Sequence, residues 1–280
     1  MRRVFFHIHI WKTAGATFLN ICRNNFGKAF HRDIMIIQES TLSTQQLNWL
    51  LAYHKWIRCY SCHMLSGDLP YDVEDTEVLG ISFVRNPIDR FISSYNYMMD
   101  DNYRGGYSKG TSFDEIYACT FVNVDNPWWR NGQTHIIGGN TSEEEALSLI
   151  RKRLKTGRLI LLVTERFDES CIVLERLFPA DFKDCSYIRY NVSPKKRLVT
   201  ESQRKAVSEY MNLDTELLAI ANDYLDATLD RLYPNLNERQ QYLNDFKKRC
   251  KLKERKNRLI NSVKSIERIT KRAIMKTISS

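Results

Sequence analysis

The sequence predicts an α/β fold built around a parallel β-sheet, because short apolar strands alternate with amphipathic helical segments. Residues 4–10 are rich in β-formers, and residues 78–84 are dominated by apolar side chains, as expected of strands covered on both faces. A helical segment follows each of them, as the crossover connections of a parallel sheet require. We therefore expect a central parallel sheet with helices on both sides.

The other elements are assigned in chain order from periodicity and capping. A first helix at residues 18–26 follows the first strand, and a polar-capped helix at residues 43–54 precedes an alternating strand at residues 56–62. Residues 68–75 contain proline and aspartate and predict a loop, and Pro87 suits the first turn of a helix that ends near residue 99. The same criteria predict a Gly- and Tyr-rich loop at residues 100–112, helices at residues 113–119 and 143–155, a strand at residues 158–163, and helices at residues 168–178, 200–211 and 214–232.

Charge divides the chain into two parts. From residue 246 to the end there are 13 Lys and Arg against two acidic residues, whereas the preceding 245 residues carry 29 against 31. We expect a domain at residues 1–245 and a basic amphipathic helical tail at residues 246–280. Residues 247–276 are suited to an anionic membrane surface, an acidic polymer or a partner helix. Nucleic-acid binding is not expected, because no recognition motif accompanies the charge.

Composition indicates a cytoplasmic protein, with peripheral contact at the inner face of the membrane through the tail. No run approaches the ~18 apolar residues of a membrane span, and no signal peptide is evident. Seven scattered cysteines are expected to be reduced thiols. Cys59 and Cys62 form a CxxC pair, but a structural zinc site needs a second pair at comparable spacing, and none follows.

The turn after the first strand has the features of a phosphate-binding site. Lys12, Thr13 and Gly15 lie between the strand and the first helix. The N–H groups and dipole of a helix N-terminus attract an anion, and Lys12 adds a full positive charge. This turn is not a Walker A loop, since Gly15 follows the lysine instead of preceding it.

Residues 12–17 (KTAGAT) resemble the phosphosulfate-binding loop, close to PKTGGTS, of sulfotransferases that use 3′-phosphoadenosine 5′-phosphosulfate (PAPS). Further stretches are similar, in the same order, to motifs of the carbohydrate 2-O/6-O-sulfotransferase-like family, sulfotransferase family 2. They are residues 60–64 (YSCHM), 85–95 (RNPIDRFISSY), 131–134 (NGQT), 162–170 (LVTERFDES) and the region 211–225. The resemblance covers about residues 4–235 and implies a P-loop-like three-layer fold with additional C-terminal helices.

The resemblance implies a bacterial enzyme that moves the sulfuryl group of PAPS, in line and without a required metal, to a hydroxyl of a glycan or glycolipid. His63 would accept the proton of the hydroxyl, and Lys12 would offset charge on the departing 5′-phosphate. Arg85 and Ser93, eight positions apart, would hold the 3′-phosphate. The complete set expected to bind the nucleotide is Lys12, Thr13, Ala14, Gly15, Ala16, Thr17, Arg85, Ser93, Gln133, Thr134 and Arg166.

Several positions depart from the family pattern. Trp11 replaces a proline, Ala14 a glycine, Ala16 a hydroxyl residue, and Cys62 the glycine before the histidine.

Two other functions therefore stay open. A P-loop-type kinase would need magnesium and a carboxylate to hold it, and no clear Walker B strand ends in aspartate. A non-catalytic adaptor of the same fold would dock through its basic tail.

Overall fold

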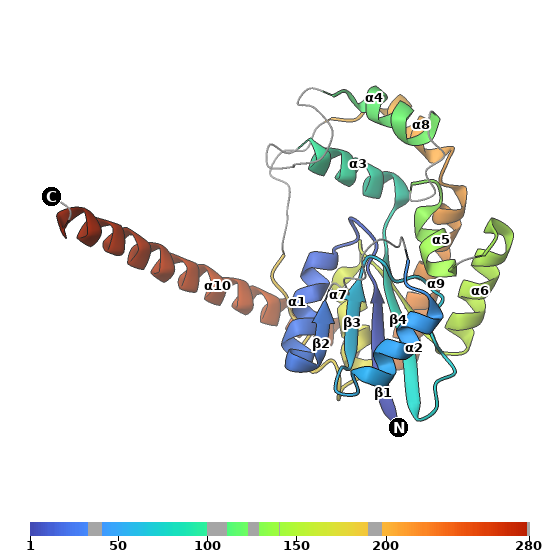
Figure 1. Ribbon diagram of the computed structural model, residues 1–280, viewed down its shortest axis with the longest axis horizontal. Coiled ribbons are helices and arrows are strands. Elements are labelled where there is room, and N and C mark those ends of the chain that lie inside the picture. The colour runs from blue at the N-terminus through green and yellow to red at the C-terminus, as the bar shows by residue number, and fades with distance from the viewer. Residues whose placement is uncertain (33–40, 100–110, 123–128, 140, 190–197, 279–280) are drawn as a thin grey trace.

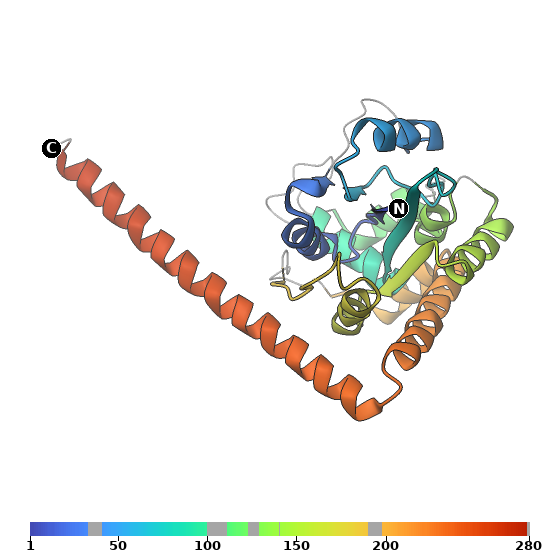
Figure 2. The same cartoon turned by 90° about the horizontal axis from the view of Figure 1, so that it is seen from below.

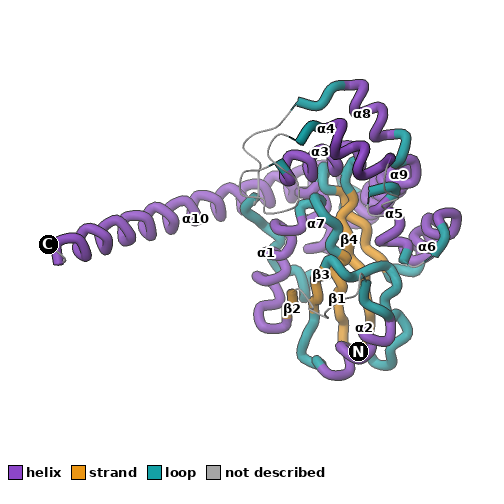
Figure 3. Tube along the Cα trace, turned by 45° about the horizontal axis from the view of Figure 1, so that its top comes forward, coloured by secondary structure: helices purple, strands orange, loops and turns teal. Residues whose placement is uncertain are grey.

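The computed structural model confirms the α/β fold: five parallel strands form one sheet in the order β2-β3-β1-β4-β5, with helices on both sides (Figures 1 and 3). It describes residues 1–32, 41–99, 111–122, 129–139, 141–189 and 198–278. The strands are β1 (Arg2–Ile8), β2 (Phe30–Arg32), β3 (Cys59–Cys62), β4 (Thr76–Val84) and β5 (Leu159–Val163). The helices are α1 (Gly15–Phe26), η1 (Gly27–Ala29), α2 (Thr44–Tyr53), α3 (Pro87–Met98), α4 (Phe113–Tyr117), the π-helical turn η2 (Ala118–Val122), α5 (Gly132–Gly138), α6 (Glu143–Lys155), α7 (Phe167–Leu177), α8 (Glu201–Ser208), α9 (Asn212–Leu232) and α10 (Leu236–Ile278).

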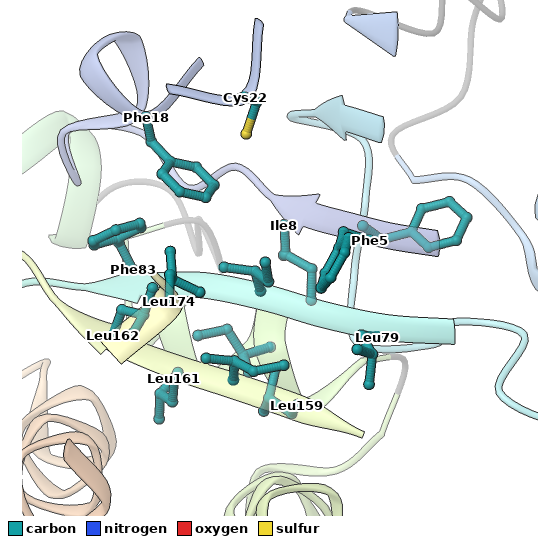
Figure 4. Close-up of a cluster of buried hydrophobic side chains, with 14 of the residues drawn as sticks. Phe5, Ile8, Phe18, Cys22, Leu79, Phe83, Leu159, Leu161, Leu162 and Leu174 are labelled. Atoms are coloured by element: carbon teal, nitrogen blue, oxygen red, sulfur yellow. The ribbon is translucent and has the colours of Figure 1, made fainter. Parts of the chain in front are cut away.

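The core forms on both faces of the sheet. Helices α1 and α7 cover one face, and α2, α6 and α9 cover the other (Figures 1 and 2). Every residue of β5 and the last seven of β4 are buried, which explains why these strands lack a polar face. Phe18 and Cys22 of α1 point toward the side chains of β1 and β4, where Phe18 packs 5.0 Å from the Phe83 ring (Figure 4).

Two parts of the sheet differ from the sequence prediction. The second predicted strand is shorter than expected, because residues 56–58 precede β3 and Trp56 is 61% exposed. The edge strand β2, which pairs in parallel with β3, was not predicted. Its three residues are half-buried or exposed, so they carry no apolar pattern that marks a strand. Most of the predicted loop at residues 100–112 lies outside the described residues.

Helix α10 begins ten residues before the predicted tail, at Leu236, and its first part packs against α7. Phe246 is fully buried, and Arg249 pairs with Glu175 at 2.7 Å. Beyond this contact the helix extends away from the body (Figures 1 and 2). The division at residues 245 and 246 and the membrane contact stay predictions. No helix within the described ranges combines the length and apolarity needed to cross a membrane.

The turn between β1 and α1 has an unusual backbone. Lys12 and Ala14 both have positive φ angles, 66° and 63°, in the left-handed region that favours glycine. Ala14 is the N-cap of α1 and offers no side-chain oxygen to the helix N–H groups. Gly15 follows because a Cβ at this position would overlap the His9 ring. The turn therefore holds the start of α1 at a cost in backbone strain.

His7 and His9 pack against the start of α1. Their rings stack 5.0 Å apart, and His7 meets the edge of the Phe18 ring at 4.6 Å. Burial lowers the pKa of His9 to about 3, helped by electrostatic repulsion from His63 and Arg32 when His9 is protonated. Burial also lowers the pKa of His7 well below its usual value. Both rings are therefore neutral in the folded protein near neutral pH.

We expect the protein to lose stability in acid because of these two histidines. At pH values between about 3 and ~6.5, His9 binds a proton in the unfolded chain but not in the folded protein. The contribution of neutral His9 to the unfolding free energy is therefore complete above pH ~6.5 and is lost as the pH falls. From pH 7 to pH 5, wild type should lose about 2 kcal/mol more unfolding free energy than His9→Gln in urea titrations. The exposed His31 supplies a control, and His31→Gln should follow wild type. Equal slopes for wild type and His9→Gln would contradict the assignment.

We also expect Ala14→Gly to be tolerated. Alanine in the left-handed region costs about 1 kcal/mol relative to glycine, which offsets the entropy lost by introducing glycine. Ala227→Gly, at an exposed position inside α9, should destabilise by about 1 kcal/mol in the same urea titration. A loss at Ala14 as large as that at Ala227 would show that the turn is not strained.

Candidate active site

A cavity of about 560 Å³ lies at the carboxyl ends of the strands, where parallel sheets bind ligands, and α3 crosses above this end of the sheet (Figure 1). Its described lining comes from the residues that end or follow the strands and from α1 and α3. The cavity thus brings together many residues named from the sequence. They are Lys12, Ala14, Gly15, Ala16, His63, Arg85 and Ser93.

Lys12 lies between an aromatic ring and a second cation. Its ammonium nitrogen is 4.3 Å from the centre of the Tyr97 ring, a cation–π contact. Its carbonyl oxygen accepts a hydrogen bond from Nη1 of Arg85 at 2.9 Å. Burial, and then the charge of Arg85, lower the pKa of Lys12. A bound anion would offset both effects, since it would compensate the buried charge.

Arg85 leaves the end of β4 with its backbone fixed by Gln133. The Arg85 N–H donates to Gln133 Oε1, and Gln133 Nε2 donates to the Arg85 carbonyl, both at 2.9 Å. Burial lowers the pKa of the Arg85 guanidinium, although Glu165 and Asp89 oppose the shift. Ser93 lines the same cavity from α3. Arg85 and Ser93 thus share one cavity, and their joint binding of a phosphate stays a prediction.

Gln133 and Thr134 lie at the start of helix α5, an element that the sequence patterns did not predict, and both are fully buried. The cause is the buried carboxylate of Asp214 on α9. It accepts from the backbone N–H of Gln133 at 3.2 Å and of Thr134 at 2.8 Å, and so satisfies the N-terminus of α5. Gln133 therefore positions Arg85, and neither residue is among those that line the cavity.

Three other residues predicted to bind the nucleotide also lie outside the described lining. Arg166 forms ion pairs with Glu169 and Asp226, both at 2.6 Å, and the hydrogen bond that it donates to Glu169 is the first cause of its raised pKa. The buried Thr13 hydroxyl donates to the carbonyl of Ile10 at 2.9 Å, and Thr17 is buried. These side chains stabilise the surroundings of the cavity.

His63 follows β3 and is held by His9. Nδ1 of His63 lies 2.6 Å from the carbonyl oxygen of His9, and the two rings stack 3.8 Å apart. A carbonyl oxygen only accepts hydrogen bonds, so Nδ1 carries the hydrogen and the lone pair of the neutral ring is on Nε2. Trp11, 44% exposed, lies 5.7 Å from the His63 ring and also lines the cavity.

The cavity includes residues that sequence reasoning did not name. Tyr97, Thr164, Asn20, Arg23 and Arg32 all line it. The hydroxyl oxygen of Thr164 is buried and has no hydrogen-bond partner, so it is a polar atom suited to a ligand. Thr164 follows β5 directly, so its place at the end of a predicted strand is the sequence signal that could have identified it. The described residues contain no group of three or more His, Cys, Asp or Glu that could hold a metal ion.

Comparison with known proteins finds a family match for the N-terminal part of the chain. The family model described as the sulfotransferase family matches residues 2–131. This stretch contains β1, the strained turn, His63, Arg85 and Ser93, and therefore most of the cavity lining. No curated protein matches the chain. The N-terminal part of the chain, residues 2–131, is therefore similar to the sulfotransferase family.

Proposed function

We propose that this cavity transfers a sulfuryl group from PAPS to a hydroxyl of a carbohydrate, on a glycan or glycolipid. The observation that carries the proposal is the meeting of three groups in one cavity: the Lys12 turn, the Arg85 and Ser93 pair, and His63. Each serves one requirement of the reaction, namely binding of the 5′ side of the donor, binding of its 3′-phosphate and removal of a proton.

The charges of the cavity fit the proposed donor. PAPS supplies the sulfuryl group and a phosphate leaving group when it is bound. Lys12 and the N-terminus of α1 would bind its 5′ end, and Arg85 and Ser93 its 3′-phosphate. Both cations have lowered pKa values because they are buried, and the described lining contains no Asp or Glu to neutralise them. An anionic ligand is therefore the natural counter-charge.

His63 is oriented to act as the base. The His9 carbonyl fixes the hydrogen on Nδ1, so Nε2 is the atom that accepts the proton of the acceptor hydroxyl. Stacking on His9 holds the plane of the ring. Lys12 stabilises the negative charge that develops on the departing 5′-phosphate.

Trp11 supports a carbohydrate acceptor. Its half-exposed ring lies beside His63, and a flat aromatic face beside a catalytic base suits the apolar face of a sugar. A magnesium-dependent kinase is less well supported. Magnesium is bound in part through carboxylates, and none of the fifteen described residues that line the cavity has one.

Calorimetric titration with 3′-phosphoadenosine 5′-phosphate tests the donor. We expect metal-independent binding that Arg85→Ala weakens about 10- to 100-fold, because a charged hydrogen bond to phosphate is lost. Arg151→Ala, which removes a surface pair with Glu216, is the matched control and should leave the affinity unchanged. Absence of binding, or preference for magnesium-ATP in a parallel titration, would instead favour the kinase or the adaptor.

Turnover with PAPS tests the base. We expect His63→Ala to lower kcat by about 10²- to 10⁴-fold, the usual contribution of a general base, while the affinity for 3′-phosphoadenosine 5′-phosphate changes less than about 3-fold. His135→Ala removes a histidine that pairs with Glu143 outside the described cavity lining and should retain activity. Full turnover in His63→Ala would contradict this mechanism and would leave the family match of residues 2–131 unaffected.

A further inference from the structure

The outer part of helix α10, residues 254–278, extends away from the rest of the protein, and we call it the distal helix (Figures 1, 2 and 3). Lys253 anchors α10 just before it, because its ammonium group donates to the Ser186 carbonyl at 2.7 Å and lies 3.5 Å from Asp184. At about 1.5 Å per residue, the distal helix is about 37 Å long. Most helices in proteins are stabilised by packing of an apolar face, so a projecting helix of this length is expected to pack on a partner.

The charge of the distal helix indicates the sign of this partner. Residues 254–278 contain eight Lys and Arg against two acidic residues. Among the described side chains of this part, Arg255, Lys256 and Arg258 are all exposed. Arg249 differs from them, because it lies closer to the body and pairs with Glu175 at 2.7 Å. The distal helix thus presents positive charge to solvent, and this charge suits an anionic partner.

The helix also exposes apolar side chains. Leu252, Leu259 and Ile260 are 60%, 68% and 50% exposed. Leu252 and Leu259 are seven residues apart, or about two helical turns, and Ile260 is next to Leu259, so the three lie on one side of the helix. The sequence continues this spacing at Val263 and Ile266. The helix therefore combines an apolar stripe with cations beside and between its apolar residues.

This combination favours a membrane surface over an acidic polymer or a partner helix. Binding to an acidic polymer uses the positive charges and gives the exposed leucines no role. Pairing with a second copy of this helix would bring like charges together, which disfavours association. At a bilayer surface, by contrast, apolar side chains enter the boundary between head groups and acyl chains, and Lys and Arg meet the anionic head groups.

We propose that the distal helix binds in the plane of a bilayer that contains anionic lipid, and so holds the domain at the membrane surface. Leu259 and Ile260 enter the boundary of the acyl chains. Arg255, Lys256 and Arg258 bind lipid phosphates, with their long side chains reaching toward the head groups. The proposal is independent of the reaction that the cavity performs.

Co-sedimentation of the full chain with vesicles tests the part played by charge. The probes are phosphatidylcholine vesicles with and without about 30% phosphatidylglycerol. We expect at least about tenfold tighter binding to the anionic vesicles, weakening as salt is added. Each cation near such a surface contributes about fivefold, so joint replacement of three of them should weaken binding about 100-fold. The three substitutions are Arg255→Gln, Lys256→Gln and Arg258→Gln.

A matched variant controls for net charge. It removes three exposed cations from the body, namely Lys28→Gln, Lys152→Gln and Lys155→Gln, and should change binding less than about threefold. Equal binding of wild type to neutral and anionic vesicles, no binding to either, or the same behaviour of the two triple variants would overturn the proposal.

A second pair of variants tests the apolar stripe. Leu259→Gln combined with Ile260→Gln should weaken binding to the anionic vesicles about tenfold, because less apolar surface is buried. Leu198→Gln combined with Leu236→Gln replaces two leucines that are also exposed and should bind like wild type. Glutamine favours helix, so circular dichroism should show unchanged helix content in all variants. Full binding by the variant at 259 and 260 would mean attraction by charge alone, as for an acidic polymer, and would overturn insertion into the membrane surface.

Discussion

The buried carboxylate of Asp214 is the contact on which the geometry of the cavity depends. It satisfies the first N–H groups of α5 and lies 3.7 Å from the guanidinium of Arg90 on α3. It therefore links α9, α5 and α3 at one point of very low exposure. Gln133, fixed at the start of α5, then holds both backbone groups of Arg85. Asp214, far along the chain, thus helps to determine where Arg85, the proposed phosphate-binding arginine, leaves the sheet. Loss of either Asp214 or Arg90 would leave the other buried charge uncompensated.

The described part of the cavity combines this rigid support with a lining that contains cations and no carboxylate. Other arginines of the fold form ion pairs: Arg166 with Glu169, and Arg249 with Glu175. Lys12 instead contacts a tyrosine ring, and burial, followed by the charge of Arg85, lowers its pKa. Such an arrangement lowers the stability of the free protein, and binding of an anion restores that stability.

Sequence patterns predicted the parallel sheet and most of its flanking helices, though not α5, because buried strands and capped helices leave clear local signals, as at residues 78–84 and at Pro87. They also placed Lys12, His63 and Arg85 at one end of the sheet, since parallel topology brings these positions together. They did not reveal β2, whose exposed residues have no apolar pattern, or the role of Gln133 and Thr134. That role depends on Asp214, about 80 residues away, and such a contact has no local signature. Arg23 was hidden for a similar reason, because a surface arginine on a helix is common unless a neighbouring strand end completes a cavity.

The alanines of the turn show how a binding loop can depart from its family pattern without losing its geometry. Ala14 keeps the left-handed backbone that a glycine adopts more readily, and Gly15 is retained where the His9 ring leaves no room for a Cβ. The N–H groups that would bind an anion belong to the backbone and are present in any residue except proline. Replacing Gly by Ala at position 14 therefore changes mainly the strain energy of the turn, whereas replacing a hydroxyl residue at Ala16 removes one side-chain donor. The chemistry of the turn then depends more heavily on Lys12 and the start of α1, which is consistent with their burial together at the carboxyl end of the sheet.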